Sequence, residues 1–211
     1  MRVYKFLNCK YGLRALRQRR LKISEIGSLN DPFDLIPVDL SDARVRMAFL
    51  HNREQLGKKQ GLLCFSRTWH NPVLWAHYSE SHRGLCLGFE IPEGGPTNRR
   101  NVEYVDQLIK LPDNLDLEFA EGLLFSKYAH WGYEDEVRLW VALEEKSGDF
   151  FFHDFDHELL LCEVIVGAGN RTSKRRIAEA LGSRQSAVRI MKARLAYDAF
   201  KVVEDEEGFG W

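Results

Sequence analysis

Two glutamates in the second half of the chain, Glu134 and Glu136, are candidates for chemistry. They stand in the segment WGYEDEVRLW, immediately before a run of apolar residues that predicts a strand. On an extended strand entry, side chains two positions apart point the same way, so both carboxylates are predicted on one face. Two such carboxylates repel, which raises one pKa unless a cation or ligand hydroxyls separate them. Arg138 follows on the same face and can pair with Glu136, so the segment is either a solvated, salt-bridged strand edge or part of a site.

A second candidate region is the aromatic and histidine-rich segment 69–82. Trp75 and Tyr78 are three residues apart and therefore share one face of a helix. This face either packs on the sheet, which we favour for Trp75 alone, or forms an aromatic wall for a flat ligand such as a nucleobase or nicotinamide. Ser66, at the end of the preceding predicted strand, would then supply a polar contact.

The sequence gives little indication of a metal site or of the common catalytic and nucleotide-binding motifs. His77 and His82 are five residues apart, so on a helix they diverge too far to bind one metal ion as an i,i+4 pair does. The segment 153–158 (HDFDHE) is dense in possible ligands but reads equally well as a charged strand end and turn. The cysteines are far apart with no C-x-x-C pair, and no P-loop, dinucleotide-binding glycine motif or G-x-S-x-G elbow is present.

The composition limits the class of protein. The 211 residues carry 30 Lys and Arg against 31 Asp and Glu, and this near-neutral balance argues against a protein that mainly coats duplex nucleic acid. This balance does not exclude a local basic patch that binds nucleic acid. No apolar stretch approaches the length of a membrane span and no secretory leader is evident, so we expect a cytoplasmic protein without a membrane partner.

The elements that must position these residues alternate irregularly between strands and helices. We therefore predict a single α+β domain over residues 1–211, with several antiparallel strand neighbours. Helices are predicted at 11–20, 42–56, 71–81, 115–125 and 173–181. Strands are predicted at 3–6, 21–23, 61–65, 84–90, 101–105, 137–143, 150–153, 162–166, 188–191 and 195–203. The segment LNDPFD at 29–34 predicts a turn.

Several of these segments together resemble a bacterial family known as DUF 2971. They are VYKF near the start, LNDPFD at 29–34, LLCFS at 62–66, NPVLWAHYSESHRGLCLGFE at 71–90, WGYEDEVRLW at 131–140 and CEVIVGAG at 162–169. The family name carries no activity.

The order of elements also resembles the split mixed β-sheet, flanked by helices, of ADP-ribosyltransferases. Residues 61–90 are similar to the strand–helix–strand core of that fold, and Glu134-x-Glu136 is similar to its E-x-E element. Ser66-Arg67-Thr68 departs from the S-T-S motif at its second and third positions. Tyr4 and Lys5 stand in the first strand, where that family has His or Arg.

The second resemblance implies a mechanism in which NAD is consumed as a substrate. Nicotinamide would stack on Tyr78 or Trp75 with Ser66 bonded to the ribose or carboxamide. Glu136 would stabilise the oxocarbenium-like cation that forms as nicotinamide leaves, and Glu134 would deprotonate the acceptor. Ser66, one of the two aromatic residues and Glu136 are therefore expected to line one cleft. The predicted NAD-binding residues are Tyr4, Asn30, Asp31, Ser66, Trp75, His77 and Tyr78.

The function expected from this resemblance is an ADP-ribosyltransferase or an NAD glycohydrolase, with a role as a toxin or phage-defence effector. Its acceptor is a protein, a nucleic acid or water. The alternative is a non-catalytic module that binds a nucleotide or nucleic acid through the same aromatic pocket. A metal-assisted nucleic-acid hydrolase that uses His77, His82 and the acidic segment ranks last.

Overall fold

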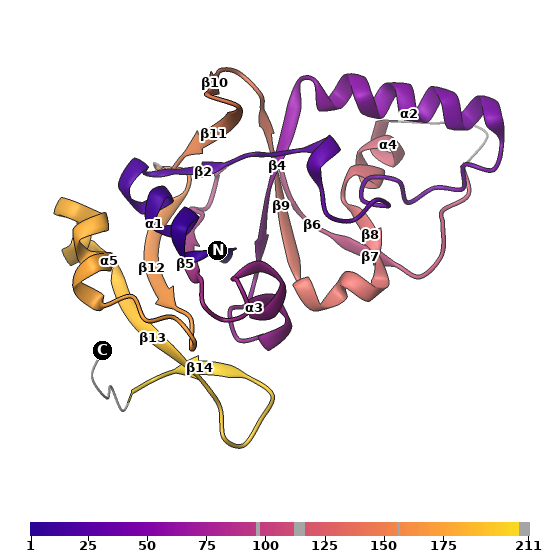
Figure 1. Cartoon of the computed structure of the whole chain (residues 1–211). Helices are drawn as coiled ribbons and strands as arrows, with labels where there is room; N and C mark the ends of the chain where they lie inside the picture. The colour runs from indigo at the N-terminus through magenta and orange to yellow at the C-terminus, as the bar shows by residue number, and fades with distance from the viewer. Residues whose placement is uncertain (96–97, 112–116, 156, 207–211) are drawn as a thin grey trace. The chain divides into compact units, whose positions relative to one another are not determined.

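Strands and helices alternate along the chain, which forms an α+β structure with a large mixed sheet and helices (Figure 1). The computed structural model describes residues 1–95, 98–111, 117–155 and 157–206. The chain groups into two compact units. The first unit contains Met1–Leu21, Phe65–Thr97 and His153–Trp211, and the second unit contains Lys22–Cys64 and Asn98–Phe152.

The sheet of the first unit is built around β5 (Leu85–Glu90), which is buried from Leu85 to Phe89, as its apolar run predicts. This strand pairs antiparallel with β1 (Arg2–Leu7) on one side and with β12 (Leu160–Val166) on the other. The next strand, β13 (Arg189–Leu195), is parallel to β12 and pairs antiparallel with β14 (Val202–Glu204). Because parallel neighbours need a crossover, helix α5 (Lys174–Leu181) lies between β12 and β13 in the chain.

Side-chain caps fix where the helices of the first unit begin. Asn8 accepts a hydrogen bond from Tyr11 N at the start of α1 (Cys9–Gln18), and Ser173 caps α5 in the same way. Asn71 caps α3 (Pro72–Tyr78), whose first residue is a proline. The caps Asn71 and Ser173 confirm the predicted starts of α3 and α5. Helix α1 begins two residues before its predicted start, and α3 ends at Tyr78, three residues before the predicted end of that helix at residue 81. The short helix η3 (Gly182–Ala187) follows α5.

Two glycines let backbone segments of the first unit approach closely. A Cβ on Gly84 would lie 2.1 Å from the carbonyl oxygen of Leu7, and one on Gly167 would lie 2.3 Å from that of His82. Only glycine fits at these distances. This explains the glycines of the HRG and GAG segments.

The second unit has its own strand pairs. Strand β4 (Gln60–Ser66), which passes into the first unit after Cys64, pairs antiparallel with β3 (Ser24–Glu25) and neighbours β9 (Glu136–Ala142). Strand β9 pairs antiparallel with β6 (Arg99–Asn101). The other strands of the unit are the parallel pair β7 (Glu103–Val105) and β8 (Ser126–Tyr128), and β10 (Lys146–Ser147), which pairs antiparallel with β11 (Phe150–Asp154). Strands β2 (Arg20–Lys22) and β11 each have residues in both units.

The helices of the second unit are α2 (Ala43–Gly57) and α4 (Leu117–Leu124), with short helices η1 (Ile26–Ser28) and η2 (Ala129–Glu134). Asp42 caps α2 through hydrogen bonds from Arg44 N and Val45 N, as expected for an Asp at a helix start. The predicted caps of α4, Asp113 and Asn114, lie outside the described residues. A core of Ile26, Leu35, Leu62, Phe125 and Trp140 holds the unit together.

Three local predictions are wrong. The predicted strand 101–105 is two short strands, β6 and β7, that end and begin on either side of Val102. In the predicted strand 195–203, β13 ends at Leu195 and β14 begins only at Val202. The entry to β9 is not extended, because Glu134 ends helix η2 and Asp135 has a φ of 46°.

Among the described residues, no helix has both the length and the apolar character needed to span a bilayer.

Candidate functional site

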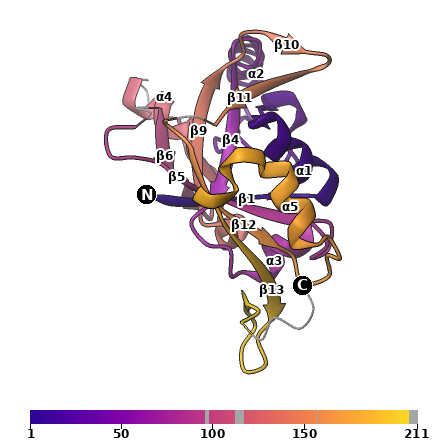
Figure 2. The same cartoon turned by 90° about the vertical axis from the view of Figure 1, so that its left-hand side faces the viewer.

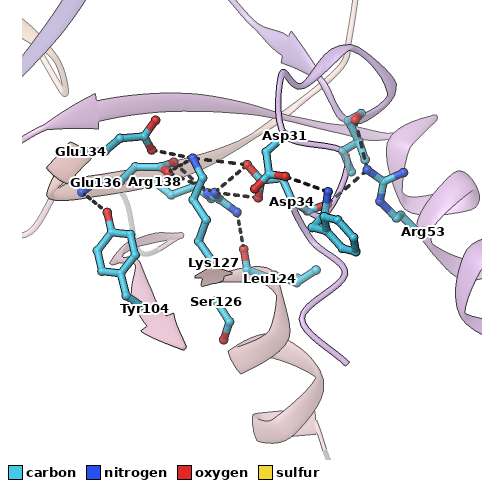
Figure 3. Close-up of polar contacts among 12 residues, drawn as sticks. Asp31, Asp34, Arg53, Tyr104, Leu124, Ser126, Lys127, Glu134, Glu136 and Arg138 are labelled. Carbon is cyan, nitrogen blue, oxygen red and sulfur yellow. Dashed lines mark hydrogen bonds and ion pairs between the residues drawn. The ribbon is translucent and has the colours of Figure 1, made fainter. Parts of the chain in front are cut away.

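A cluster of charged side chains is buried inside the second unit (Figure 3). We call it the buried ion cluster and define it by Asp34, Lys127, Glu134, Glu136 and Arg138. None of these residues is more than 6% exposed. Burying charge is costly unless each group is paired and hydrogen-bonded, so the contacts within the cluster decide whether it is stable.

Each member is placed by a different local structure. Asp34 ends a turn of the LNDPFD segment, which is closed by a hydrogen bond from Asp34 N to Asp31 O of 3.1 Å. Lys127 is the middle residue of β8, and Glu134 is the last residue of η2. Glu136 and Arg138 are two positions apart on β9 and share a face, as predicted.

Arg138 connects the LNDPFD turn to strand β9. Its Nε donates to Glu136 Oε1 at 3.0 Å, and its Nη2 lies 2.9 Å from Asp34 Oδ1. Its Nη1 donates to the carbonyl oxygen of Leu124 at 2.9 Å. The guanidinium is fully buried, and its donors reach one neighbour on the same strand, Glu136, and two groups on other segments, Asp34 and Leu124.

Lys127 connects the two glutamates of the E-x-E element. Its Nζ donates to Glu134 Oε2 at 2.5 Å and to Glu136 Oε2 at 3.2 Å. It also lies 3.7 Å from Asp34 Oδ2 and 4.9 Å from the centre of the Trp131 ring. The two glutamates therefore do meet, but through an ammonium group and not because they share a strand face. The prediction that Glu134 and Glu136 lie on one face of an extended strand is therefore wrong.

The charges keep Glu136 ionised. Burial alone would raise the pKa of Glu136, but the adjacent Arg138 and Lys127 outweigh it and lower the pKa to about 2. Burial likewise works against the charged form of Lys127, whose pKa is nevertheless raised by Glu136, Glu134 and Asp34. Asp34 differs, because burial raises its pKa more than Arg138 and Lys127 lower it. With every group ionised, the three carboxylates exceed the two cations by one negative charge.

Two further polar groups flank the cluster. Asp31 is 4% exposed, and its Oδ1 accepts a hydrogen bond from Phe33 N at 2.9 Å. Its buried Oδ2 has no hydrogen-bond partner within the part of the chain that the structure describes. Tyr104 accepts a hydrogen bond from Glu136 N at its hydroxyl, and burial raises its pKa to about 12. Asn30, the other predicted residue of this turn, is exposed.

Two cationic side chains lie among the carboxylates of the buried ion cluster. Lys127 and Arg138 contact the carboxylates of Asp34, Glu134 and Glu136 directly. Over residues 1–95, 98–111, 117–155 and 157–206, no group of three or more His, Cys, Asp or Glu side chains is arranged to hold a metal. Chemically, the cluster offers a fixed anionic site with one excess negative charge.

The first unit contains the predicted NAD-binding residues Tyr4 and Ser66. They face each other across the antiparallel pair β1 and β4. Ser66 is 4% exposed and its hydroxyl accepts a hydrogen bond from Thr68 N at 3.2 Å. Burial, together with the nearby Glu163, raises the pKa of Tyr4 to about 12, so its phenol stays protonated.

The aromatic residues of α3 differ in accessibility. Trp75 is fully buried, its Nε1 donates to the carbonyl oxygen of Trp69 at 2.6 Å, and its ring packs edge-on against Phe6 at 5.2 Å. It is a core residue and offers no open face to a ligand. Tyr78 is half-buried and His77 is exposed. Of the two aromatic residues predicted to stack on a flat ligand, Tyr78 is therefore the one that is partly accessible.

The predicted residues thus lie in two places. The first unit contains five of the predicted site residues: Tyr4, Ser66, Trp75, His77 and Tyr78. The second unit contains the other four: Asn30, Asp31, Glu134 and Glu136. The cleft expected to be shared by Ser66, Tyr78 and Glu136 stays a prediction.

Sequence reasoning missed Asp34, Lys127 and Tyr104 as members or neighbours of the site. Asp34 was visible as the last residue of the LNDPFD segment but was not separated from the turn. Lys127 carried a signal too, since a single lysine stands among apolar and aromatic residues in LLFSKY. Lysine is rarely buried unless it is paired, so such a residue in a short strand points to buried carboxylates.

Comparisons of the chain with protein-family models, with curated proteins and with solved structures found no match. The two resemblances described above therefore remain predictions.

Proposed function

We propose that this chain is an NAD-consuming enzyme of the ADP-ribosyltransferase type. One observation carries the proposal: the buried ion cluster joins Asp34 of the LNDPFD segment to the E-x-E element, 102 positions later in the case of Glu136. A buried ion pair is often no more stabilising than apolar side chains of similar size, so stability alone is a weak reason for such a cluster. Clusters of this kind concentrate at functional sites.

The excess negative charge suits the proposed chemistry. In the reaction, the bond between nicotinamide nitrogen and ribose C1′ breaks, and nicotinamide leaves with the bonding electrons. Positive charge develops on the ribose, and a fixed anion nearby lowers the energy of that state. Glu136 supplies the anion, because its low pKa keeps it charged at neutral pH. Glu134 accepts the proton that the attacking acceptor or water loses.

Substrate has to reach the buried ion cluster before Glu136 can act on it. Because no member of the cluster is more than 6% exposed, substrate must gain access by displacing the turn that carries Asp31 and Asp34. Closing segments of this kind are common in enzymes that exclude water from the reacting groups. On the first unit, the proposal assigns Tyr78 to nicotinamide stacking and Ser66 to the ribose or carboxamide.

Incubation with NAD and chromatography of released nicotinamide tests the proposal. We expect turnover by the wild type and a loss of about 10²–10³-fold in Glu136→Gln, since one well-placed electrostatic group contributes about that much. Tyr78→Ala should raise the KM for NAD. The matched control is Glu90→Gln, which removes a partly exposed carboxylate paired with Arg2 and should leave turnover unchanged. Equal turnover in Glu136→Gln and wild type, with only the melting temperature lowered, would contradict the proposal.

The burial of Glu136 favours a second candidate, a non-catalytic nucleotide-binding module. In that case the cluster only stabilises the second unit, and Glu136 never contacts ligand. The same experiment separates the two candidates. NAD binding in calorimetry that depends on Tyr78, without nicotinamide release at any enzyme concentration, would support the module.

A further inference from the structure

Two helices of the first unit, α1 and α5, lie side by side (Figures 1 and 2). A contact of 3.2 Å between Cys9 Sγ and Thr172 Oγ1 joins the start of α1 to the residue before the cap of α5. Leu13 and Leu16 of α1, and Ile177 of α5, are buried against the unit. The apolar faces of both helices are therefore already covered, and their outer faces are polar.

The outer faces carry a concentration of positive charge that the net charge of the whole chain hides. We define the basic face by Lys10, Arg14 and Arg17 of α1 and by Lys174, Arg175 and Arg176 of α5, all of them exposed. The α1 residues are four and three positions apart and so share one face of that helix. Their spacing makes a continuous row of cations.

Acidic residues are nearly absent from the two segments of the chain that carry this face. No Asp or Glu occurs between Met1 and Ser24, and Glu179 is the only one between Val164 and Leu195. Glu179 is paired with Arg175 at 3.5 Å, and both side chains are largely exposed, so this pair neutralises little. The chain as a whole has a formal charge of −1, so the cations are segregated and not merely abundant.

The placement of three of these cations opposes local stability. Lys174, Arg175 and Arg176 form the first turn of α5, which contains no acidic residue. The positive end of the helix dipole lies there, so cations are unfavourable and anions are preferred. A local rule broken in this way indicates that the charges serve a partner and not the helix itself.

We propose that the basic face binds the phosphate backbone of a nucleic acid. Arginine provides four of its six cations, and arginine is suited to phosphate because its guanidinium presents paired donors. A membrane surface fits less well. Helices that lie on bilayers insert an apolar face, whereas the apolar faces of α1 and α5 are buried and Tyr11, 53% exposed, is the large apolar side chain beside the row. This inference does not rest on the proposed function.

Fluorescence anisotropy with labelled 20-base-pair duplex DNA, duplex RNA of the same length and single-stranded DNA tests the proposal between 50 and 200 mM KCl. If the face contacts four to six phosphates, affinity for duplex DNA should fall by about 10²–10³-fold across this range, because each contact contributes about −0.9 to the salt slope. The three probes distinguish duplex from single strand and DNA from RNA.

A charge-matched pair of variants locates the binding. The quadruple variant Arg14→Gln, Arg17→Gln, Arg175→Gln and Arg176→Gln should bind at least 10-fold more weakly at 100 mM KCl. If all four side chains contact phosphate, its salt slope should be less negative by about 3.6. The control variant, Arg44→Gln, Lys59→Gln, Lys110→Gln and Lys146→Gln, removes as many exposed cations from the second unit and should bind as the wild type does.

Equal loss in both variants would mean nonspecific attraction and would overturn the proposal. So would binding to vesicles of phosphatidylserine and phosphatidylcholine in the absence of binding to any of the three nucleic acids. Circular dichroism of both variants should show unchanged helix content, since glutamine has nearly the helix propensity of arginine.

Discussion

At the scale of single residues, Arg138 is the group on which the buried ion cluster depends. It is fully buried, contacts both Asp34 and Glu136, and also bonds the backbone of Leu124. Removing one partner of a buried ion pair leaves the other charges without compensation, which is far more costly than removing a surface pair. The cluster is therefore expected to be sensitive to truncation even if it contributes little net stability.

Arg138→Met tests this expectation in the second unit. We expect the free energy of unfolding to fall by about 3–5 kcal/mol, because Asp34 and Glu136 lose their closest cation. The control is Arg189→Met, which breaks the exposed pair of Arg189 with Glu204 at 2.6 Å and should cost about 0–1 kcal/mol. Urea unfolding of both variants measures the difference. Losses of similar size would show that the cluster is solvated in solution.

At the scale of elements, the segment that follows α3 stores backbone strain. Glu80, Ser81 and His82 all have left-handed φ values, of 54°, 52° and 66°. Hydrogen bonds from Ser81 N to Ala76 O and from His82 N to Trp75 O hold the turn, and the His82 ring stacks on Trp75. Consecutive left-handed residues other than glycine are rare, because each costs about 1–2 kcal/mol.

Replacing one of them by glycine should relieve this cost. We expect Ser81→Gly to raise the free energy of unfolding by up to about 1 kcal/mol, the removed strain exceeding the extra chain entropy of glycine in the unfolded state. Ser41→Gly is the control. Ser41 is also exposed, but its φ is not left-handed, so the same change should be neutral or destabilising. Thermal unfolding that shifts equally in both variants would argue against strain at Ser81.

At the scale of the whole molecule, the sequence predicted the helices and strands better than the contacts between distant segments. Continuous apolar runs identified β4, β5, β9 and β12, and the capping residues Asn71 and Ser173 identified where α3 and α5 begin. These signals are local, so they can be read from a single sequence.

The candidate site could be predicted only in part, because it depends on contacts between distant segments. The pairing of Glu136 with Arg138 follows from strand periodicity, but the contact of Arg138 with Asp34 spans 104 positions and has no local signal. The predicted extended entry, which would put Glu134 on the same strand face as Glu136, is wrong because Asp135 adopts a left-handed conformation that no pattern of apolar residues encodes. The division into two units is hidden for the same reason, since each unit is assembled from separated segments.

The confinement of the buried ion cluster to the second unit has a consequence for the whole molecule at low pH. The pKa of Glu136 in the folded protein is lowered from 4.5 to about 2 by Arg138 and Lys127, which outweigh burial. A lowered pKa contributes stability above the unfolded-state value, and this contribution is lost as the pH falls from 4.5 toward 2. It amounts to roughly 3 kcal/mol. Asp34, whose pKa is raised by burial, shifts stability in the opposite direction and offsets part of the loss.

Hydrogen exchange between pH 5 and 2.5, resolved by segment and corrected for the intrinsic rate, should therefore show β8 and β9 losing protection first. Strands β5 and β12 of the first unit should lose it later, because Glu90 and Glu163 there pair with the N-terminal ammonium and Arg2, which are partly exposed, and such pairs contribute less. In Glu136→Gln the extra acid sensitivity of β8 and β9 should disappear, since glutamine does not titrate. Simultaneous loss in all four strands, or an unchanged pH dependence in the variant, would show that Glu136 does not control the acid stability of the second unit.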